Sequence, residues 1–502
     1  MGQHDVIIIG SGVGGSMVAR RLAENGARVL LLERGDFVPR EDQNWDVQTV
    51  FFDKKYKAQE TWLDGENMPF DPGVYYNVGG STKFYGAAMF RLRERDFEEL
   101  EHEAGISPAW PIRYADLEPY YDAAEQMFGV HGDDTLDRTA PAGRKDYPFP
   151  AVVSEPVVAE FASRLRLQGL SPSSLPLAIN SGPQGNCILC KTCDGFPCKI
   201  AAKNDAETCA LEPAIATGRV DLLTKTYARR LLLSPDGHSI SAVEVIQAGE
   251  VKTYAAKIVV VACNAVNSAA LLLRSADTQV PNGVANKSGV VGRHYMVHNQ
   301  SALMGLSLRY NKTIFQKTLA INDFYFGDES FPYPMGQVQM LGKLQGGMLS
   351  ANIPHLPRFV GAEMARHSID WLVLSEDLPD PENRVTVNGE TIKLAVKRNN
   401  MKGHDRLVGK MKSALQKGGY PIVLTKSLAA HATAHQCGTV RFGDTPSKAA
   451  LDPFCRSFDH ANLFVVDASF FPSSAAVNPA LTIAAQALRA ADHMLKNDLG
   501  VK

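Results

Sequence analysis

A glycine-rich segment near the start of the chain has the residue types and spacing of a phosphate-binding turn. Gly10, Gly12 and Gly15 follow a run of apolar residues, and a second apolar run ends in Glu33. In such a turn the first glycine permits a tight bend, the second lets the backbone approach a pyrophosphate, and the third lets a helix pack closely on the strand. An acid at the end of the second strand can bind a ribose diol. The segment predicts a dinucleotide site, and it does not distinguish NAD from FAD.

Four cysteines crowd into one later segment, with the spacing C-x2-C-x2-C-x4-C at Cys187, Cys190, Cys193 and Cys198. Thiolates at such spacing can converge on a zinc ion or an iron–sulfur cluster. The ferredoxin run, however, has one residue fewer before its fourth cysteine and a proline after it, whereas here Pro197 comes first. We therefore expect structural thiols, or a local disulfide under oxidation, and no bound metal. An iron–sulfur or zinc protein that uses this run is the alternative.

Histidines offer a second kind of chemistry. His431 and His435 have the spacing H-x3-H, which on a helix can hold a metal ion. No third ligand with helpful spacing accompanies them, so we expect no metal there either. A lone histidine is more often a packing residue, and we interpret His431, His294 and His298 in that way.

The helix and strand patterns around these groups are of the α/β type at both ends of the chain. Helices are expected at 14–25, 108–129, 265–275 and 479–495, and strands at 6–9, 28–33, 219–245, 253–261 and 462–467. From 301 to 427 apolar and polar residues alternate, which is typical of half-exposed antiparallel strands. Those strands are expected at 301–310, 336–344, 370–374, 384–387, 391–396 and 420–425, with one helix near 404–417. An α/β domain therefore begins, is interrupted by a mostly β domain, and is completed at the C-terminus.

The overall composition excludes several classes of protein. With 52 Lys plus Arg against 54 Asp plus Glu, the formal net charge is −2, so neither nucleic acid nor an acidic membrane surface is an expected partner. The longest apolar runs have the length of strands and cannot span a membrane. The first strand begins almost at the N-terminus and leaves no room for a signal peptide, so we expect a cytoplasmic protein. The 502 residues suffice for two large cores.

The order of these pieces resembles the glucose–methanol–choline (GMC) flavin oxidoreductases over essentially the whole chain. The segments that carry the resemblance are 78–82, 265–273, 376–384, the His-x-x-Gly-Thr sequence 435–439, and 462–483 with its Val-Asp-Ala-Ser and Asn-Pro-Ala-Leu-Thr sequences. The resemblance implies that the dinucleotide is FAD. It also implies a Rossmann-type α/β FAD-binding domain with an interleaved substrate domain on an antiparallel sheet, as in p-hydroxybenzoate hydroxylase. Bacterial members often carry a Cys-rich segment ahead of Ala-Lys-Asn, as at 202–204 here, without a metal cluster.

Domain limits and site residues follow from the same resemblance. The FAD-binding domain would comprise 1–50, 76–106, 181–300 and 431–502, the loop over the site 51–75, and the substrate-binding domain 107–180 and 301–430. His435 matches the family's base, which removes the hydroxyl proton while hydride passes to the flavin, and Asn478 matches the residue that hydrogen-bonds the same hydroxyl. The implied FAD contacts are Gly10, Gly12, Gly15, Glu33, Arg34, Gly79, Gly80, Thr82, Tyr85, Asp467, Pro479 and Thr482, with a backbone contact to adenine from 220–223.

Two positions depart from the family pattern. Asn264 stands where a glycine is usual, and asparagine tolerates a left-handed backbone better than most residues. The segment 81–85 has no histidine, whereas fungal pyranose oxidases carry one there that bonds covalently to the flavin. We therefore expect non-covalent FAD. Tyr85 also replaces a common asparagine, which leaves the surroundings of the flavin open.

The segment 79–97 is similar to bacterial pyranose-oxidase relatives, including glycoside 3-oxidases. This similarity implies oxidation of a secondary hydroxyl of a sugar or glycoside, with molecular oxygen as the acceptor. Polar side chains on the alternating strands are available for such a substrate, namely Gln316, Asn322, Gln337, Gln339 and Asn352. A dehydrogenase with another acceptor, a choline, cholesterol or simple-alcohol substrate, and a flavin-binding protein without turnover stay open, as does the oligomeric state. The presence of both His435 and Asn478 argues against loss of turnover.

Overall fold

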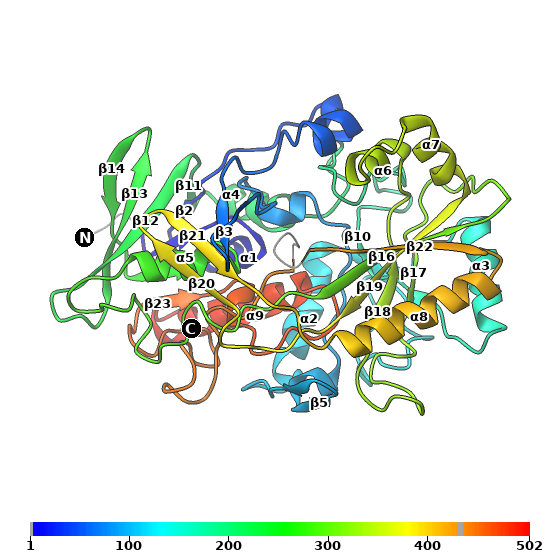
Figure 1. The fold of residues 1–502 in the computed structure, drawn as a ribbon. Helices are drawn as coiled ribbons and strands as arrows, with labels where there is room; N and C mark the ends of the chain where they lie inside the picture. The colour runs from blue at the N-terminus through cyan, green and yellow to red at the C-terminus, as the bar shows by residue number, and fades with distance from the viewer. Residues whose placement is uncertain (1–3, 430–434, 502) are drawn as a thin grey trace.

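The computed structural model describes residues 4–429 and 435–501. Its first layer is a parallel sheet of five strands in the order β11-β2-β1-β15-β23 (Figure 1). These strands are β1 (Val6–Ile9), β2 (Val29–Leu32), β11 (Val220–Leu223), β15 (Ile258–Val261) and β23 (Leu463–Val465). β1, β2 and β15 are buried along their whole length, which explains their continuous apolar sequences. The predicted Rossmann-type α/β arrangement is confirmed.

Helices from both ends of the chain pack on this sheet. α1 (Val13–Glu24) lies against α9 (Ala480–Asn497), which in turn contacts α2 (Tyr114–Phe128), and α5 (Ala265–Arg274) follows β15. The backbone at the start of α1 approaches its neighbours closely. A Cβ on Gly14 would lie 2.1 Å from the Val466 oxygen, and one on Gly15 would lie 2.0 Å from the Gly10 oxygen. Both positions therefore require glycine.

The second large sheet is antiparallel (Figure 1). It lies at the opposite end of the molecule from β12 (Thr226–Leu233), β13 (Ile240–Gln247) and β14 (Glu250–Tyr254). It has the order β22-β16-β19-β18-β17-β9. Its strands are β9 (Ser173–Ser174), β16 (Asn299–Leu306), β17 (Leu319–Ile321), β18 (Gln337–Met340), β19 (Ser368–Ser375) and β22 (Ile422–Ser427). α3 (Pro156–Arg166) and α8 (Met401–Lys417) share a core with this sheet, centred on Trp371 and Phe161. The antiparallel sheet predicted for this part of the chain is thus present.

Smaller elements complete the described fold. Further strands are β5 (Leu100–His102), β6 (Gly105–Ser107), β7 (Val130–Gly132), β8 (Phe149–Pro150) and β10 (Leu177–Ala178). One further α-helix, α4, spans Glu212–Ala216. Short 3-10 or π-helical turns occur at Asp42–Trp45, Gln48–Phe52, Gly80–Lys83, Glu94–Phe97, Glu207–Leu211 and Ala468–Phe470. No helix among the described residues is both long and apolar enough to cross a membrane.

The region 301–427 differs from its predicted pattern in two ways. Two further helices, α6 (Gly346–Asn352) and α7 (Arg358–His367), join α8 there, so the expectation of one helix is wrong, as is the expectation that Asn352 lies on a strand. β20 (Arg384–Asn388) and β21 (Thr391–Ala395) leave the substrate-domain sheet and pair with β3 (Trp62–Asp64) and β4 (Pro69–Phe70). The reason is burial, because these strands contribute Val385, Ile392 and Leu394 to the core that surrounds the parallel sheet.

The glycine contacts generate a stability prediction. Gly15→Ala should lower the free energy of unfolding of the apoprotein by about 1–3 kcal/mol, because overpacking against a fixed backbone oxygen forces the helix and strand apart. Gly12→Ala is the matched control, since no heavy atom lies within 4 Å of its added Cβ. Chemical denaturation followed by circular dichroism measures both. Equal losses in the two variants would contradict the packing role of Gly15.

Candidate active site

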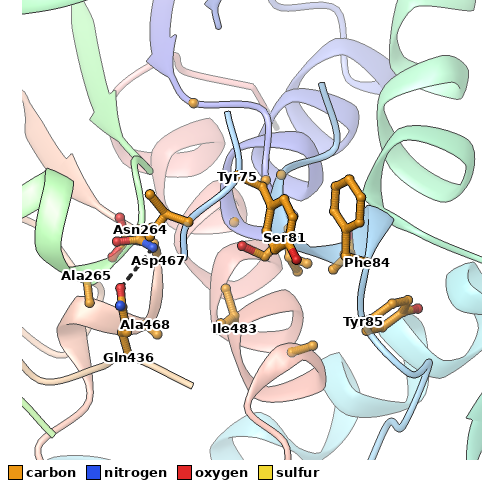
Figure 2. Close-up of a pocket in the computed structure, with 18 of the residues that line it drawn as sticks. Tyr75, Ser81, Phe84, Tyr85, Asn264, Ala265, Gln436, Asp467, Ala468 and Ile483 are labelled. Atoms are coloured by element: carbon orange, nitrogen blue, oxygen red, sulfur yellow. Dashed lines mark hydrogen bonds between the residues drawn. The ribbon is translucent and has the colours of Figure 1, made fainter. Parts of the chain in front are cut away.

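A cavity of about 460 Å³ lies where the carboxyl ends of the parallel strands face the antiparallel sheet. Ile9, Leu32 and Ala262 line it from the first sheet, and Gln300, Gln339 and Leu372 line it from the second. Figure 2 shows Tyr75, Phe84 and Tyr85 on one side and Asn264, Gln436 and Asp467 on the other, with Ile483 of α9 between them. Parallel α/β sheets bind their ligands at this edge. The cavity is therefore the candidate site.

The glycine-rich turn forms one wall of the cavity through residues 10–14. Glu33 fixes this wall, since its carboxylate accepts hydrogen bonds from Ser11 N (3.0 Å), Ser11 Oγ (2.6 Å) and Gly35 N (2.8 Å). Burial raises the pKa of Glu33. A second glycine turn touches the first, because a Cβ on Gly80 would lie 2.9 Å from Gly12 Cα. Two backbone turns thus meet at one point of the cavity surface.

Arg34 lies beside Glu33 and is held between two tyrosine rings. Its guanidinium carbon is 4.0 Å from the ring centre of Tyr76 and 4.7 Å from that of Tyr227, and it pairs with Glu60 at 2.7 Å. Such cation–π contacts fix the plane of the guanidinium. Arg34 and both tyrosines line the cavity, so this end presents flat aromatic and cationic surfaces.

Asn264, in the turn after β15, has the expected positive φ of +79°, but its ψ of 155° lies outside the left-handed helical region. Its side chain accepts a hydrogen bond from Val266 N (2.9 Å), which caps α5, and donates one to Gln436 (3.1 Å; Figure 2). Asp467, across the turn, is buried and accepts from Ser268 Oγ and from Ser469 N. Burial raises the pKa of Asp467.

Most of the residues predicted to contact the cofactor line the cavity. They are Gly10, Gly12, Glu33, Arg34, Gly80, Thr82, Tyr85, Asp467 and Pro479. Gly15, Gly79 and Thr482 are not among the lining residues: Gly79 N donates to Ser11 Oγ (3.2 Å), and the Thr482 hydroxyl lies 2.8 Å from that of Tyr121. Residues 226–228, at the start of β12, line the cavity where 220–223 were expected.

His435 and Asn478, the two candidate catalytic residues, both line the cavity. The Nδ1 atom of His435 lies 2.9 Å from Nδ1 of His298. Burial, followed by the nearby His298 and Lys317, holds the pKa of His435 well below its usual value, so its imidazole is neutral near pH 7. A neutral imidazole can accept a proton. Asn478 Oδ1 is buried without a hydrogen-bond partner among the described residues.

His298 is buried with a partner on each ring nitrogen, as expected of a packing residue, but one of those partners is the candidate base. Its Nδ1 lies 2.9 Å from His435 Nδ1, and its Nε2 lies 3.1 Å from the Ser474 oxygen. His294 does not line the cavity, and burial lowers its pKa to about 4. His431 lies outside the described residues, so the structure does not test the H-x3-H pair. The sequence signal for His298 was weak, since 137 positions separate it from His435.

A partly buried ion pair on the cavity wall was likewise not predicted from the sequence. Lys317 Nζ pairs with Asp194 Oδ1, and the other oxygen of Asp194 accepts from Gly342 N. Gly86 makes room for the pair, since a Cβ there would lie 1.7 Å from Asp194 Oδ1 and 1.9 Å from Lys317 Nζ. The Lys317 side chain is only 3% exposed. The pair joins the cysteine-rich segment to the substrate domain.

The cysteine-rich segment acts here as a wall of the cavity. Lys203 is buried, and its Nζ donates to the carbonyls of Tyr85 (2.9 Å), Cys193 (3.0 Å) and Phe196 (2.7 Å). These bonds fix the turn that carries Asp194. The eight cysteines are unpaired, and no group of three or more His, Cys, Asp or Glu side chains in the described ranges is placed to hold a metal ion. The structure therefore gives no support to the zinc or iron–sulfur alternative.

Of the proposed substrate contacts, Gln339 lines the cavity and the others do not. The amides of the others bond within the protein: Gln316 donates to Asp370 (2.8 Å), Gln337 to Asn322 (3.0 Å), Asn322 to Asp137 (2.7 Å) and Asn352 to the Met348 oxygen (2.9 Å). Gln300 and Lys317 contribute polar groups on the substrate side instead.

Comparisons with known proteins agree with this geometry. Two models described as GMC oxidoreductase match residues 4–300 and 380–487. The chain is 31% identical to 6'''-hydroxyparomomycin C oxidase of Streptomyces lividus, over 97% of this chain and 90% of the relative. It is 27% identical to the fructose dehydrogenase large subunit of Gluconobacter japonicus, over 99% and 98%. The structure of pyridoxine 4-oxidase superposes with a TM-score of 0.68 at 19% identity, covering 99% of this chain and 100% of that one. The chain belongs to the GMC oxidoreductases, a family of FAD enzymes that oxidise CH–OH groups.

Proposed function

We propose that the chain binds FAD non-covalently in this cavity and oxidises a secondary hydroxyl of a sugar or glycoside, with molecular oxygen as the acceptor. The observation that carries the proposal is the continuity of the cavity. One hollow is lined by the glycine turns of the parallel sheet, by the neutral His435, and by polar side chains of the antiparallel sheet. A dinucleotide and an alcohol can therefore bind in the same cavity, next to the same candidate base.

The lining residues fit FAD. The backbone at Gly10, Gly12 and Gly80 would hold the diphosphate, and the space around Gly12 is open, with no heavy atom within 4 Å of a Cβ built there. Glu33 and Arg34 would hold the adenosine, and Asp467 with the start of α9 would hold the ribityl chain and the pyrimidine edge. Bound FAD would accept the hydride that leaves the carbon. The absence of histidine from 81–85 supports a non-covalent cofactor.

On the substrate side, His435 would accept the hydroxyl proton and Asn478 would orient the same hydroxyl. The unpartnered Oδ1 of Asn478 and the neutral state of His435 suit these roles. Gln300, Gln339 and the Asp194–Lys317 pair offer donors and acceptors for further hydroxyl groups. This polarity favours a sugar over a simple alcohol, and the similarity to a fructose dehydrogenase points to the same substrate class.

Flavin bleaching by a panel of sugars tests the proposal. We expect purified protein to be yellow, to release free flavin on acid treatment, and to lose its flavin absorbance anaerobically with at least one sugar or glycoside. Repeating the reaction in air with peroxide detection then distinguishes an oxidase from a dehydrogenase, since both kinds occur among the relatives. Protein that cannot be reconstituted with FAD, or flavin that no sugar reduces, would refute the proposal.

His435→Ala should retain FAD and reduce its flavin about 100- to 10,000-fold more slowly than the parent, because the positioned base is lost. Asn478→Ala should also be slower, through loss of hydroxyl orientation. His493→Ala in α9, outside the lining residues, is the control and should reduce its flavin at the parent rate. Stopped-flow absorbance measures all three. If the His435→Ala variant reduced its flavin at nearly the parent rate, His435 would not be the base.

Lys317→Gln should raise the sugar concentration for half-maximal flavin reduction by about 10- to 100-fold, since a hydrogen bond to a charged group contributes about 1.5–3 kcal/mol. The control is Lys312→Gln, because this lysine lies five positions away on the same segment and is exposed to solvent. Titration of the reduction rate with the best sugar gives the comparison. An unchanged half-saturation in Lys317→Gln would exclude the ion pair from substrate binding.

A further inference from the structure

His435, which lines the cavity, and His298, which is buried behind it, are held together by the backbone as well as by their rings. Met296 N donates to the Cys437 oxygen (3.0 Å), and Cys437 N donates to the Met296 oxygen (2.9 Å). Each histidine lies two residues from this bridge. The rings of His298 and His435 are nearly perpendicular, at 84°, and present their Nδ1 atoms to each other at 2.9 Å. The contact is therefore part of the fold.

The contact of His298 Nε2 with a backbone carbonyl determines which nitrogen of His298 carries its proton. Its Nε2 lies 3.1 Å from the Ser474 oxygen, and a carbonyl oxygen only accepts hydrogen bonds, so Nε2 carries the hydrogen. His298 is buried and its pKa is lowered by that burial, which leaves the ring neutral with one N–H. Its Nδ1 is then an acceptor. The Nδ1–Nδ1 hydrogen bond consequently takes its proton from His435.

We propose that His298 is a positioning residue that fixes His435 as the Nδ1–H tautomer and so leaves Nε2 of His435 unprotonated. The inference rests on the proposed function, in which that lone pair receives the hydroxyl proton: the substrate O–H bond breaks and an Nε2–H bond forms. The protonated His435 still donates from Nδ1 to a neutral acceptor. Its new positive charge therefore faces a lone pair of His298 and not a second imidazolium.

The surrounding groups are compatible with this assignment. The side-chain nitrogen of Gln300 lies 3.3 Å from His435 Nδ1. The nitrogen and oxygen of an amide can exchange places by a half-turn of the group, and Gln300 then accepts a hydrogen bond from the N–H at Nδ1. The Ser474 carbonyl is anchored from both sides: Ser474 Oγ donates to the Asp377 oxygen (3.2 Å), and Ala475 N donates to Glu376 Oε1 (3.2 Å). A fixed carbonyl keeps the tautomer of His298 fixed.

Nitrogen NMR of the holoenzyme labelled with ¹⁵N-histidine tests the tautomer directly. The His435 signals, identified by their loss in His435→Gln, should comprise a protonated Nδ1 and an unprotonated Nε2. In His298→Leu the Nδ1–H loses its acceptor and the signals should move toward a mixture of tautomers. A parent His435 with its proton on Nε2 would overturn the proposal. This measurement needs no substrate, so it separates the proposal from the failure of the sugar assay.

Rescue in the kinetics distinguishes positioning from packing. His298→Leu should keep FAD and slow flavin reduction by about 10- to 1,000-fold, since a base in the wrong tautomer is inactive. His298→Asn restores an amide oxygen near the position of Nδ1 and should recover most of the rate. His404→Leu is the matched control: this histidine is equally buried, bonds Ser301 and Ser375, and does not line the cavity. Equal rates in the Leu and Asn variants of His298 would overturn the proposal.

Discussion

The close approach of backbone to backbone at the start of α1 sets the geometry on which the rest of the site depends. Gly14 lies against the Val466 carbonyl and Gly15 against that of Gly10, at distances that no Cβ would allow. The residue after Val466 is Asp467, and α9 begins shortly afterwards at Ala480. Contact between the first helix and the last strand thus brings the two ends of the chain to one cavity. A larger residue at Gly14 would separate the two ends, and one at Gly15 would push α1 away from β1.

A second constraint is the seam between the two sheets, where buried polar groups must find partners. Lys317 and Asp194 are far apart in sequence, yet each neutralises the other on the cavity wall. Below the second glycine turn, Lys83 is buried against Glu207 (2.6 Å) and Asp205 (3.0 Å). Removing one member of such a pair leaves an uncompensated charge that is largely shielded from solvent. The Lys317–Asp194 pair therefore ties the segment before β17 to the cysteine-rich segment, and the Lys83 pairs fix the second glycine turn against residues 205–207.

The parts of the fold that the sequence predicted have local patterns. Gly10, Glu33 and the apolar run at β15 fall within short segments whose periodicity and turn residues determine their structure. Positive φ at Asn264 was predictable for the same reason, because it depends on one residue type at a strand-to-helix turn. The antiparallel sheet was visible as alternation. The predicted extent of this sheet was wrong, because β20 and β21 show the same alternation but bury their apolar side chains in the core of the other domain.

The substrate side of the site was far less predictable, because it depends on which distant side chains meet. Gln316 and Gln337 have suitable chemistry, but each amide is used by a neighbouring side chain within the domain. His298 looked like one more buried histidine until the bridge between Met296 and Cys437 placed it against His435. Its contribution depends on a proton whose location is set by a peptide carbonyl on a third segment, at Ser474. Three stretches of chain must fold together before the base acquires a defined tautomer, so its chemistry is a property of the tertiary structure.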